Sequence, residues 1–172
     1  KKETEKELAK DLFLEEAKEI KKLCNARKIP FVINDSVDIA LAMDADGVHV
    51  GQQDLAVEDC RRLLGTGKIV GLSINTSDEM RRAPVDLVDY VGIGPVFHQT
   101  TKLDASPALG LEGLRTIVET SSLPSVAIGG IKAENTRAVM ATGVDGIAVV
   151  SAVCGTRSPR DAAASLRSEI DR

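Results

Sequence analysis

The sequence alternates short apolar runs with longer segments of helical periodicity, and this alternation restricts the chain to few folds. The apolar runs have the length and the β-branched composition of strands buried on both faces. We expect strands at 31–33, 48–50, 68–72, 88–93, 124–128 and 147–150. Three runs begin alike, with Ala45-Asp46-Gly47-Val48, Val88-Asp89-Tyr90-Val91 and Val144-Asp145-Gly146-Ile147. Such self-similarity indicates a repeated strand–helix unit.

The segments between the strands have apolar residues three and four positions apart, as amphipathic helices do. The first, residues 1–28, has one apolar stripe and a lysine-rich outer face. The other expected helices are 37–43, a segment through 60–64, 78–82, 111–120, 134–142 and 159–170. Strands joined by helices with right-handed crossovers predict a parallel sheet. The length of 172 residues suits one (β/α) barrel domain, residues 1–172, better than two domains.

Composition excludes several classes of function. The chain is 43% hydrophobic but only 2% aromatic, so its core is aliphatic, as is typical of α/β proteins. A net charge of −4 and a pI near 5.3 argue against a nucleic-acid partner. The three cysteines, Cys24, Cys60 and Cys154, are widely spaced, so neither a disulfide framework nor a zinc site is indicated. Without a signal peptide or a membrane-length apolar run, we expect a cytoplasmic protein with no membrane partner.

One predicted strand leads into a strongly polar loop, in the segment VDYVGIGPVFHQTTK (88–102). Gly92, Gly94 and Pro95 end the strand. The polar residues that follow are His98, Gln99, Thr100, Thr101 and Lys102. Neutral donors beside one positive charge suit a phosphate or diphosphate ligand. An ordinary solvated loop is the alternative.

Polar or small residues also come just after the other predicted strands. The full set is Asn34, Asp35, Asp54, Ser73, Thr101, Lys102, Gly130 and Ser151. The carboxyl ends of the strands form the catalytic face of a (β/α) barrel. We therefore expect these residues to share one site.

Two aspartates, Asp35 and Asp54, follow successive strands. Either one alone would most often be a helix N-cap. Together, near a lysine and several hydroxyls, they predict a Mg²⁺ site for a diphosphate, because Mg²⁺ is commonly held by one or two carboxylates and by substrate phosphates.

Two late strands end in the pattern of a phosphate site. Gly129-Gly130 and Val149-Val150-Ser151-Ala152 would expose backbone N–H groups near a short helix. Glycines placed only for a tight turn are the alternative. His49 lies inside a strand and is expected to be a packed or lining residue, and His98 has no carboxylate partner visible in the sequence.

Several segments together resemble one enzyme family, the thiamine-phosphate synthases. They are FVINDSVDIALAMDADGVHVGQQDL, GLSINTSDE, VDYVGIGPVFHQTTK, SVAIGGI and VDGIAVVSAV. The resemblance implies a TIM barrel and a transferase of thiamine biosynthesis. Such an enzyme joins 4-amino-5-hydroxymethyl-2-methylpyrimidine diphosphate to a thiazole phosphate and releases diphosphate, with Mg²⁺ as cofactor.

The resemblance also implies roles for individual residues. Asp35 and Asp54 would bind Mg²⁺, and Asn34, Ser73 and Lys102 would bind the pyrimidine diphosphate, with Lys102 and Ser73 as the catalytic candidates. The residues implied for the thiazole phosphate are Gln99, Thr100, Thr101, Gly130, Val150 and Ser151. Diphosphate departure develops negative charge on the leaving group, which Mg²⁺ and Lys102 would stabilise. The electron-rich pyrimidine can delocalise the positive charge left on carbon, so no protein nucleophile is required.

Three departures from the family pattern accompany the resemblance. The family's first strand, helix and second strand, with a Gln-x-Arg-Glu-Lys motif, have no counterpart here, so we expect an N-terminally incomplete barrel. Asn75 stands where the family usually has His, and Gln99 replaces a common Thr. Two alternatives remain open: a thiazole tautomerase, which uses a His at the position of Asn75, and an inactive phosphate-binding barrel. A homo-oligomer is also left open.

Overall fold

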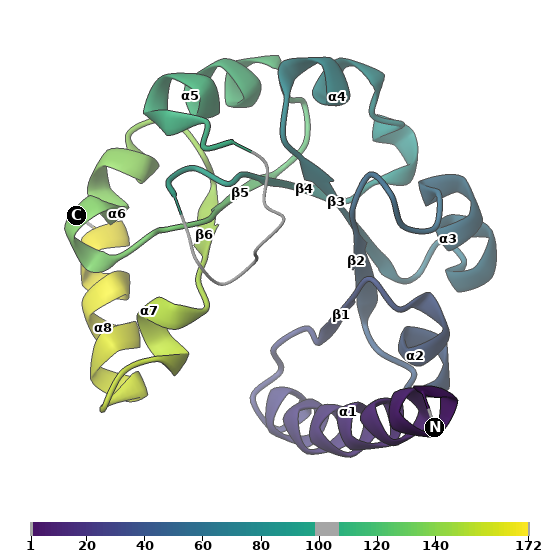
Figure 1. Cartoon of the computed structure of the whole chain (residues 1–172). Coiled ribbons are helices and arrows are strands. Elements are labelled where there is room, and N and C mark those ends of the chain that lie inside the picture. Colours follow the sequence, from purple (N-terminus) through teal and green to yellow (C-terminus); the bar gives the residue numbers. More distant parts are fainter. Residues whose placement is uncertain (1, 99–106, 172) are drawn as a thin grey trace. The chain divides into compact units, whose positions relative to one another are not determined.

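The structure is a computed structural model that describes residues 2–98 and 107–171, with side chains described from residue 12 onwards in those ranges. Helices and strands alternate along the chain (Figure 1). The strands are β1 (Val32–Asn34), β2 (Gly47–Val50), β3 (Ile69–Ile74), β4 (Tyr90–Ile93), β5 (Ser125–Ile128) and β6 (Gly146–Ala148). They are hydrogen-bonded in sequence order from β1 to β6.

The helices lie between and around these strands. They are α1 (Lys2–Ala26), α2 (Val37–Ala42), α3 (Val57–Leu64), α4 (Ser77–Arg82), the 3₁₀ helix η1 (Val85–Leu87), α5 (Gly110–Thr120), α6 (Ala133–Met140), α7 (Ser151–Cys154) and α8 (Pro159–Ile170). The chain forms two compact units, Lys1–Gly71 and Leu72–Arg172, and β3 is divided between them.

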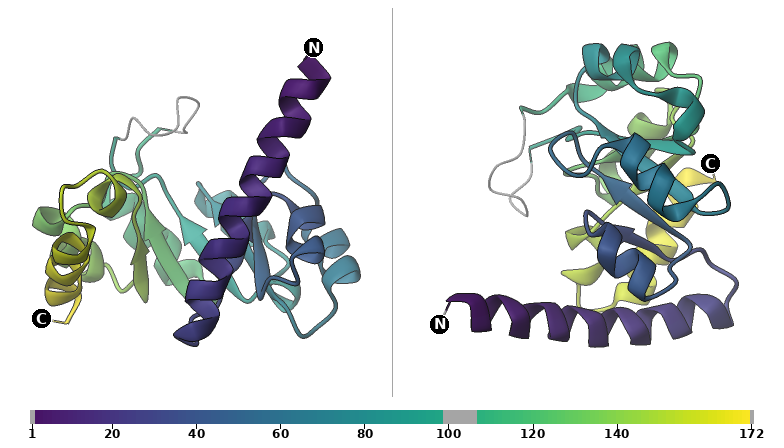
Figure 2. Two further views of the ribbon diagram at one scale, coloured as in Figure 1. Left: turned by 90° about the horizontal axis from the view of Figure 1, so that it is seen from below. Right: turned by 90° about the vertical axis from the view of Figure 1, so that its right-hand side faces the viewer.

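The first unit is built on the parallel pair β1–β2. Val32 is in register with Gly47, and Asn34 with His49. Gly47 allows the next strand to come close, because a Cβ there would lie 2.3 Å from the Ile69 carbonyl oxygen. The long helix α1 is continuous (Figure 2). It is joined to the end of α2 by Lys21, whose Nζ donates to the Met43 and Asp44 carbonyl oxygens over 2.6 and 2.7 Å.

The second unit contains the parallel pairs β4–β5 and β5–β6. Helices α5, α6 and α8 lie along one side of these strands (Figure 1). Leu114, Ile117, Val139 and Leu166 from these helices are buried. The aliphatic core predicted from composition is therefore present in this unit.

The repeated aspartate before a strand has a structural role. Asp46 Oδ2 accepts the Phe31 N–H over 2.7 Å, and Asp145 Oδ2 accepts the Ser125 N–H over 2.8 Å. Each aspartate also donates its own N–H to the carbonyl of the same partner, over 2.9 and 3.0 Å. The repeat found in the sequence thus fixes the start of a strand against its neighbour.

Some predicted strand ends are wrong. Ser73 was expected just past a strand, but β3 continues to Ile74 and Ser73 lies within it, half-buried. Asn34 is the last residue of β1, and the last strand ends at Ala148. Strand hydrogen bonds are made by the backbone, so a polar side chain does not end a strand. The 3₁₀ helix η1 was not predicted, whereas the short helix expected near Val150 and Ser151 is present as α7.

Replacing Asp46 with Ala should destabilise the protein. Removing the half-buried carboxylate leaves the Phe31 N–H without its acceptor, which costs about 1–3 kcal/mol. Urea unfolding of Asp46→Ala measures this loss, and the exposed Asp86→Ala is the matched control, expected to stay within about 0.5 kcal/mol of wild type. Equal stability of the two variants would contradict the role given to Asp46.

Candidate functional site

Asp35 lies at the carboxyl end of β1 and is held against β2. Its N–H donates to the His49 carbonyl oxygen over 2.8 Å. Its backbone has φ 63°, a left-handed conformation that aspartate tolerates better than most residues. The N-cap of the following helix α2 is Ser36, so Asp35 is not the helix cap.

Asp54 lies in the turn that follows β2. Its Oδ2 accepts the Gly51 N–H over 2.7 Å, which closes the turn and leaves Oδ1 outside that bond. The N-cap of α3 is Ala56. Asp35 and Asp54 are both exposed, and neither is the N-cap that was the alternative interpretation.

His49 lies in β2, the strand that precedes the turn with Asp54. It is half-buried and in register with Asn34. Burial lowers the pKa of the His49 imidazole, and the Asp54 carboxylate partly opposes this shift. The prediction of a lining residue agrees with this burial. His49 was not among the predicted site residues, and its register with Asn34 could not be seen in the sequence.

The donor set in the first unit suits a hard divalent cation. The described residues contain no group of three His, Cys, Asp or Glu side chains arranged to hold a metal. Two carboxylates on adjacent strand ends are nevertheless the number that Mg²⁺ commonly takes from a protein when phosphate oxygens and water supply the rest. Asp35 and Asp54 therefore fit Mg²⁺ together with a phosphorylated ligand.

In the second unit, Gly129 and Gly130 lie against the segment that follows β4. Both have positive φ, 101° and 66°. The Val96 N–H donates to the Ile128 carbonyl over 2.9 Å, and the Phe97 N–H donates to the Gly129 carbonyl over 3.0 Å. A Cβ on Gly130 would lie 2.8 Å from Phe97 Cβ and from the His98 oxygen. The space that a Gly130 side chain would need is thus occupied by the chain itself.

Ser73 and Asn75 mark the end of β3. Asn75 donates from its backbone N–H and from Nδ2 to Glu79 Oε2, over 2.5 and 3.2 Å. The Thr76 N–H donates to the same oxygen over 3.2 Å, and Thr76 Oγ1 accepts the Glu79 N–H over 3.1 Å in a capping box. Asn75 is therefore held by the first turn of α4.

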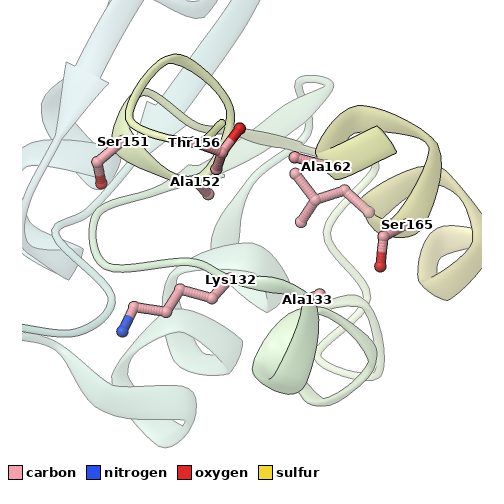
Figure 3. Close-up of a pocket in the computed structure, with 8 residues that line it drawn as sticks. Lys132, Ala133, Ser151, Ala152, Thr156, Ala162 and Ser165 are labelled. Carbon is pink, nitrogen blue, oxygen red and sulfur yellow. The ribbon is translucent and has the colours of Figure 1, made fainter. Parts of the chain in front are cut away.

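Val150 and Ser151 lie at the start of α7, where Val150 is the N-cap and Ser151 the first helical residue. Ser151 lines a hollow of about 320 Å³ between α6, α7 and α8 (Figure 3). The other lining residues are Lys132, Ala133, Ala152, Thr156, Ala162, Ser165 and Leu166.

The predicted site residues fall into three groups. Asn34, Asp35 and Asp54 belong to the first unit, and Ser73, Gly130, Val150 and Ser151 belong to the second. The remaining predictions, Gln99, Thr100, Thr101 and Lys102, lie outside the described residues.

A sequence profile of the family described as thiamine monophosphate synthase matches residues 4–153. The chain belongs to this family. Two relatives named thiamine-phosphate synthase are 48% identical over 144 residues in Streptococcus suis and 45% identical over 168 residues in Moorella thermoacetica. These matches cover 83% and 98% of this chain, and 62% and 80% of the relatives. The chain thus spans less than two thirds of the Streptococcus suis protein.

A solved structure agrees with the family. Thiamine phosphate pyrophosphorylase from Pyrococcus furiosus is 40% identical and superposes with a TM-score of 0.82, covering 92% of this chain and 75% of that one. The resemblance read from the sequence and the predicted α/β, TIM-like fold class are both confirmed. Within the described residues, no helix is both long and apolar enough to cross a bilayer.

Changing Gly130 to Ala should destabilise the protein, because a Cβ would meet Phe97 and the backbone has positive φ. Backbone strain of this kind costs about 1–3 kcal/mol. Gly146→Ala in β6 is the control, since no atom lies within 4 Å of a Cβ there. Thermal unfolding compares the two variants, and an unchanged midpoint for Gly130→Ala would contradict the packing described.

Proposed function

We propose that the protein is a thiamine-phosphate synthase. It joins 4-amino-5-hydroxymethyl-2-methylpyrimidine diphosphate to a thiazole phosphate and releases diphosphate. The observation that carries this proposal is the pair Asp35 and Asp54, which are exposed on adjacent strand ends and are not the helix N-caps. Family membership supports the choice of substrates.

Asp35 and Asp54 would hold Mg²⁺ with the diphosphate of the pyrimidine substrate. When bound, the ion would neutralise negative charge on the diphosphate. The Gly51 N–H orients the Asp54 carboxylate, and the bond from the Asp35 N–H to His49 fixes the backbone of Asp35. The Asp54 carboxylate and the Asp35 main chain are therefore ordered before the substrate arrives, which favours binding.

Lys102, Ser73 and Asn34 would contact the pyrimidine diphosphate, as the family pattern implies. The Lys102 ammonium is the candidate for stabilising the leaving diphosphate, because charge develops there as the bond to carbon breaks. The half-buried Ser73 offers a hydroxyl on β3. In this scheme the thiazole nitrogen attacks the pyrimidine methylene carbon. The scheme therefore requires no nucleophile from the protein.

The thiazole phosphate would bind at Val150, Ser151 and Gly130, with Gln99, Thr100 and Thr101. In the described part of this set, the exposed start of α7 is the more accessible contact, because Gly130 is packed against Phe97. Gly130 would therefore support the site through its close packing as well as through its backbone.

Isomerisation of a thiazole is the less favoured function. The relatives reported above are named thiamine-phosphate synthase. The tautomerase relatives are expected to use a His at position 75, where the Asn75 amide donates to Glu79. Asn75 also departs from the usual synthase residue, but the synthase scheme assigns no proton transfer to this position. A carboxamide cannot exchange protons near neutral pH as an imidazole does. An assay with both substrates distinguishes the two reactions, because only the synthase releases diphosphate.

The full-length protein should form thiamine phosphate and diphosphate from the two substrates, and Asp54→Asn should abolish most of this activity. The amide keeps an acceptor for the Gly51 N–H but removes the negative charge. We expect kcat/KM to fall by more than the roughly 10- to 100-fold that loss of an outer-shell partner costs at metal sites.

The control for Asp54→Asn is Asp59→Asn, which removes a carboxylate from α3, where Asp59 pairs with Arg62. This variant should turn over like wild type, and circular dichroism should show that both variants are folded. A wild-type rate for Asp54→Asn would remove Asp54 from the metal site, and absence of product from the wild type would refute the proposed function.

A further inference from the structure

The hollow between α6, α7 and α8 is lined by Ser151, one of the residues predicted to bind phosphate. Lys132 and Ser151 follow β5 and β6, which are parallel neighbours with Ile128 in register with Ala148. Parallel neighbours bring the residues after their carboxyl ends to the same edge of a sheet. Lys132 and Ser151 accordingly line the same hollow of about 320 Å³. In Figure 3, the Lys132 ammonium and the Ser151 hydroxyl lie on the same side of the hollow.

Among the described residues that line this hollow, Lys132 is the only charged one. Its ammonium lies 3.9 Å from Glu134 Oε1, and the two side chains are 64% and 76% exposed. Exposed ion pairs at this separation contribute little, so the ammonium can exchange this partner for a more highly charged anion. The Thr156 hydroxyl donates to the Val153 carbonyl over 2.8 Å, so the other lining donors are Lys132, Ser151 and Ser165, of which Lys132 alone carries a charge.

The backbone that carries Lys132 is fixed on both sides. The Lys132 N–H donates to Asn135 Oδ1 over 2.8 Å, and Asn135 Nδ2 donates to the Gly130 carbonyl over 3.2 Å. The buried Thr136 donates from Oγ1 to the Lys132 carbonyl over 2.8 Å. The side chain of Lys132 therefore extends from a rigid base next to Gly130, and only its own rotamers are ordered on binding.

We infer that Lys132 is a further specificity-determining residue, whose ammonium contacts the phosphate of the thiazole substrate. This inference rests on the proposed function. The other contacts assigned to that phosphate are neutral hydroxyl, amide and backbone groups, so Lys132 adds a positive charge to them. It favours the phosphorylated thiazole and takes no part in the departure of diphosphate.

The test compares Lys132→Met, Lys132→Arg and the control Arg115→Met in the full-length protein. Arg115 is an exposed cation on α5, in the same unit. We expect Lys132→Met to raise the KM for thiazole phosphate about three- to tenfold, as for a solvent-accessible charge-assisted contact. The value of kcat, the KM for the pyrimidine diphosphate and the unfolding midpoint should not change. Lys132→Arg should restore most of the affinity.

An unchanged KM for thiazole phosphate in Lys132→Met, or an equal rise in Arg115→Met, would overturn the inference. A fall in the unfolding midpoint together with changes in both KM values would show a structural role instead, and would also overturn it. Calorimetric titration with thiazole phosphate measures the same contact without turnover. A wild type that binds thiazole phosphate through Lys132 but forms no product would therefore refute only the proposed function.

Discussion

The parallel pairing of β1 with β2 determines where the two acidic residues lie. The ladder continues one residue past β1, because the Asp35 N–H donates to the His49 carbonyl. This bond holds Asp35 in its left-handed conformation at the strand end. On the next strand, Asp54 closes its own turn through the Gly51 N–H. Backbone hydrogen bonds thus position the Asp54 carboxylate and the main chain of Asp35.

Close backbone contact has a similar role in the second unit. The segment after β4 lies directly on Gly129 and Gly130, with hydrogen bonds from Val96 and Phe97. Side chains at the two glycines would push this segment away. The glycines therefore fix the path of the chain from Pro95 to His98.

The sequence was sufficient to predict the order of strands and helices, because the apolar runs are short and clearly bounded by Gly, Pro, Asp and Asn. It was also sufficient to place Asp35 and Asp54 after neighbouring strands. It could not show that Ser73 lies inside β3, since strand pairing depends on backbone hydrogen bonds to a partner far along the chain. For the same reason, the contact between Gly130 and Phe97 and the hollow beside Lys132 had no local signal. The aspartate repeat was visible, but its cause, the bond from Phe31 to Asp46, required the paired strands.

The central claim is that two carboxylates at the ends of β1 and β2 bind Mg²⁺ together with a diphosphate. Isothermal titration of the full-length protein with Mg²⁺, in the presence and absence of inorganic diphosphate, tests it most directly. Two carboxylates alone make a weak Mg²⁺ site, so the account predicts weak binding without diphosphate and much tighter binding with it. This gain should disappear in Asp35→Asn. Equal Mg²⁺ affinity in both conditions, or a gain that persists in Asp35→Asn, would contradict the account.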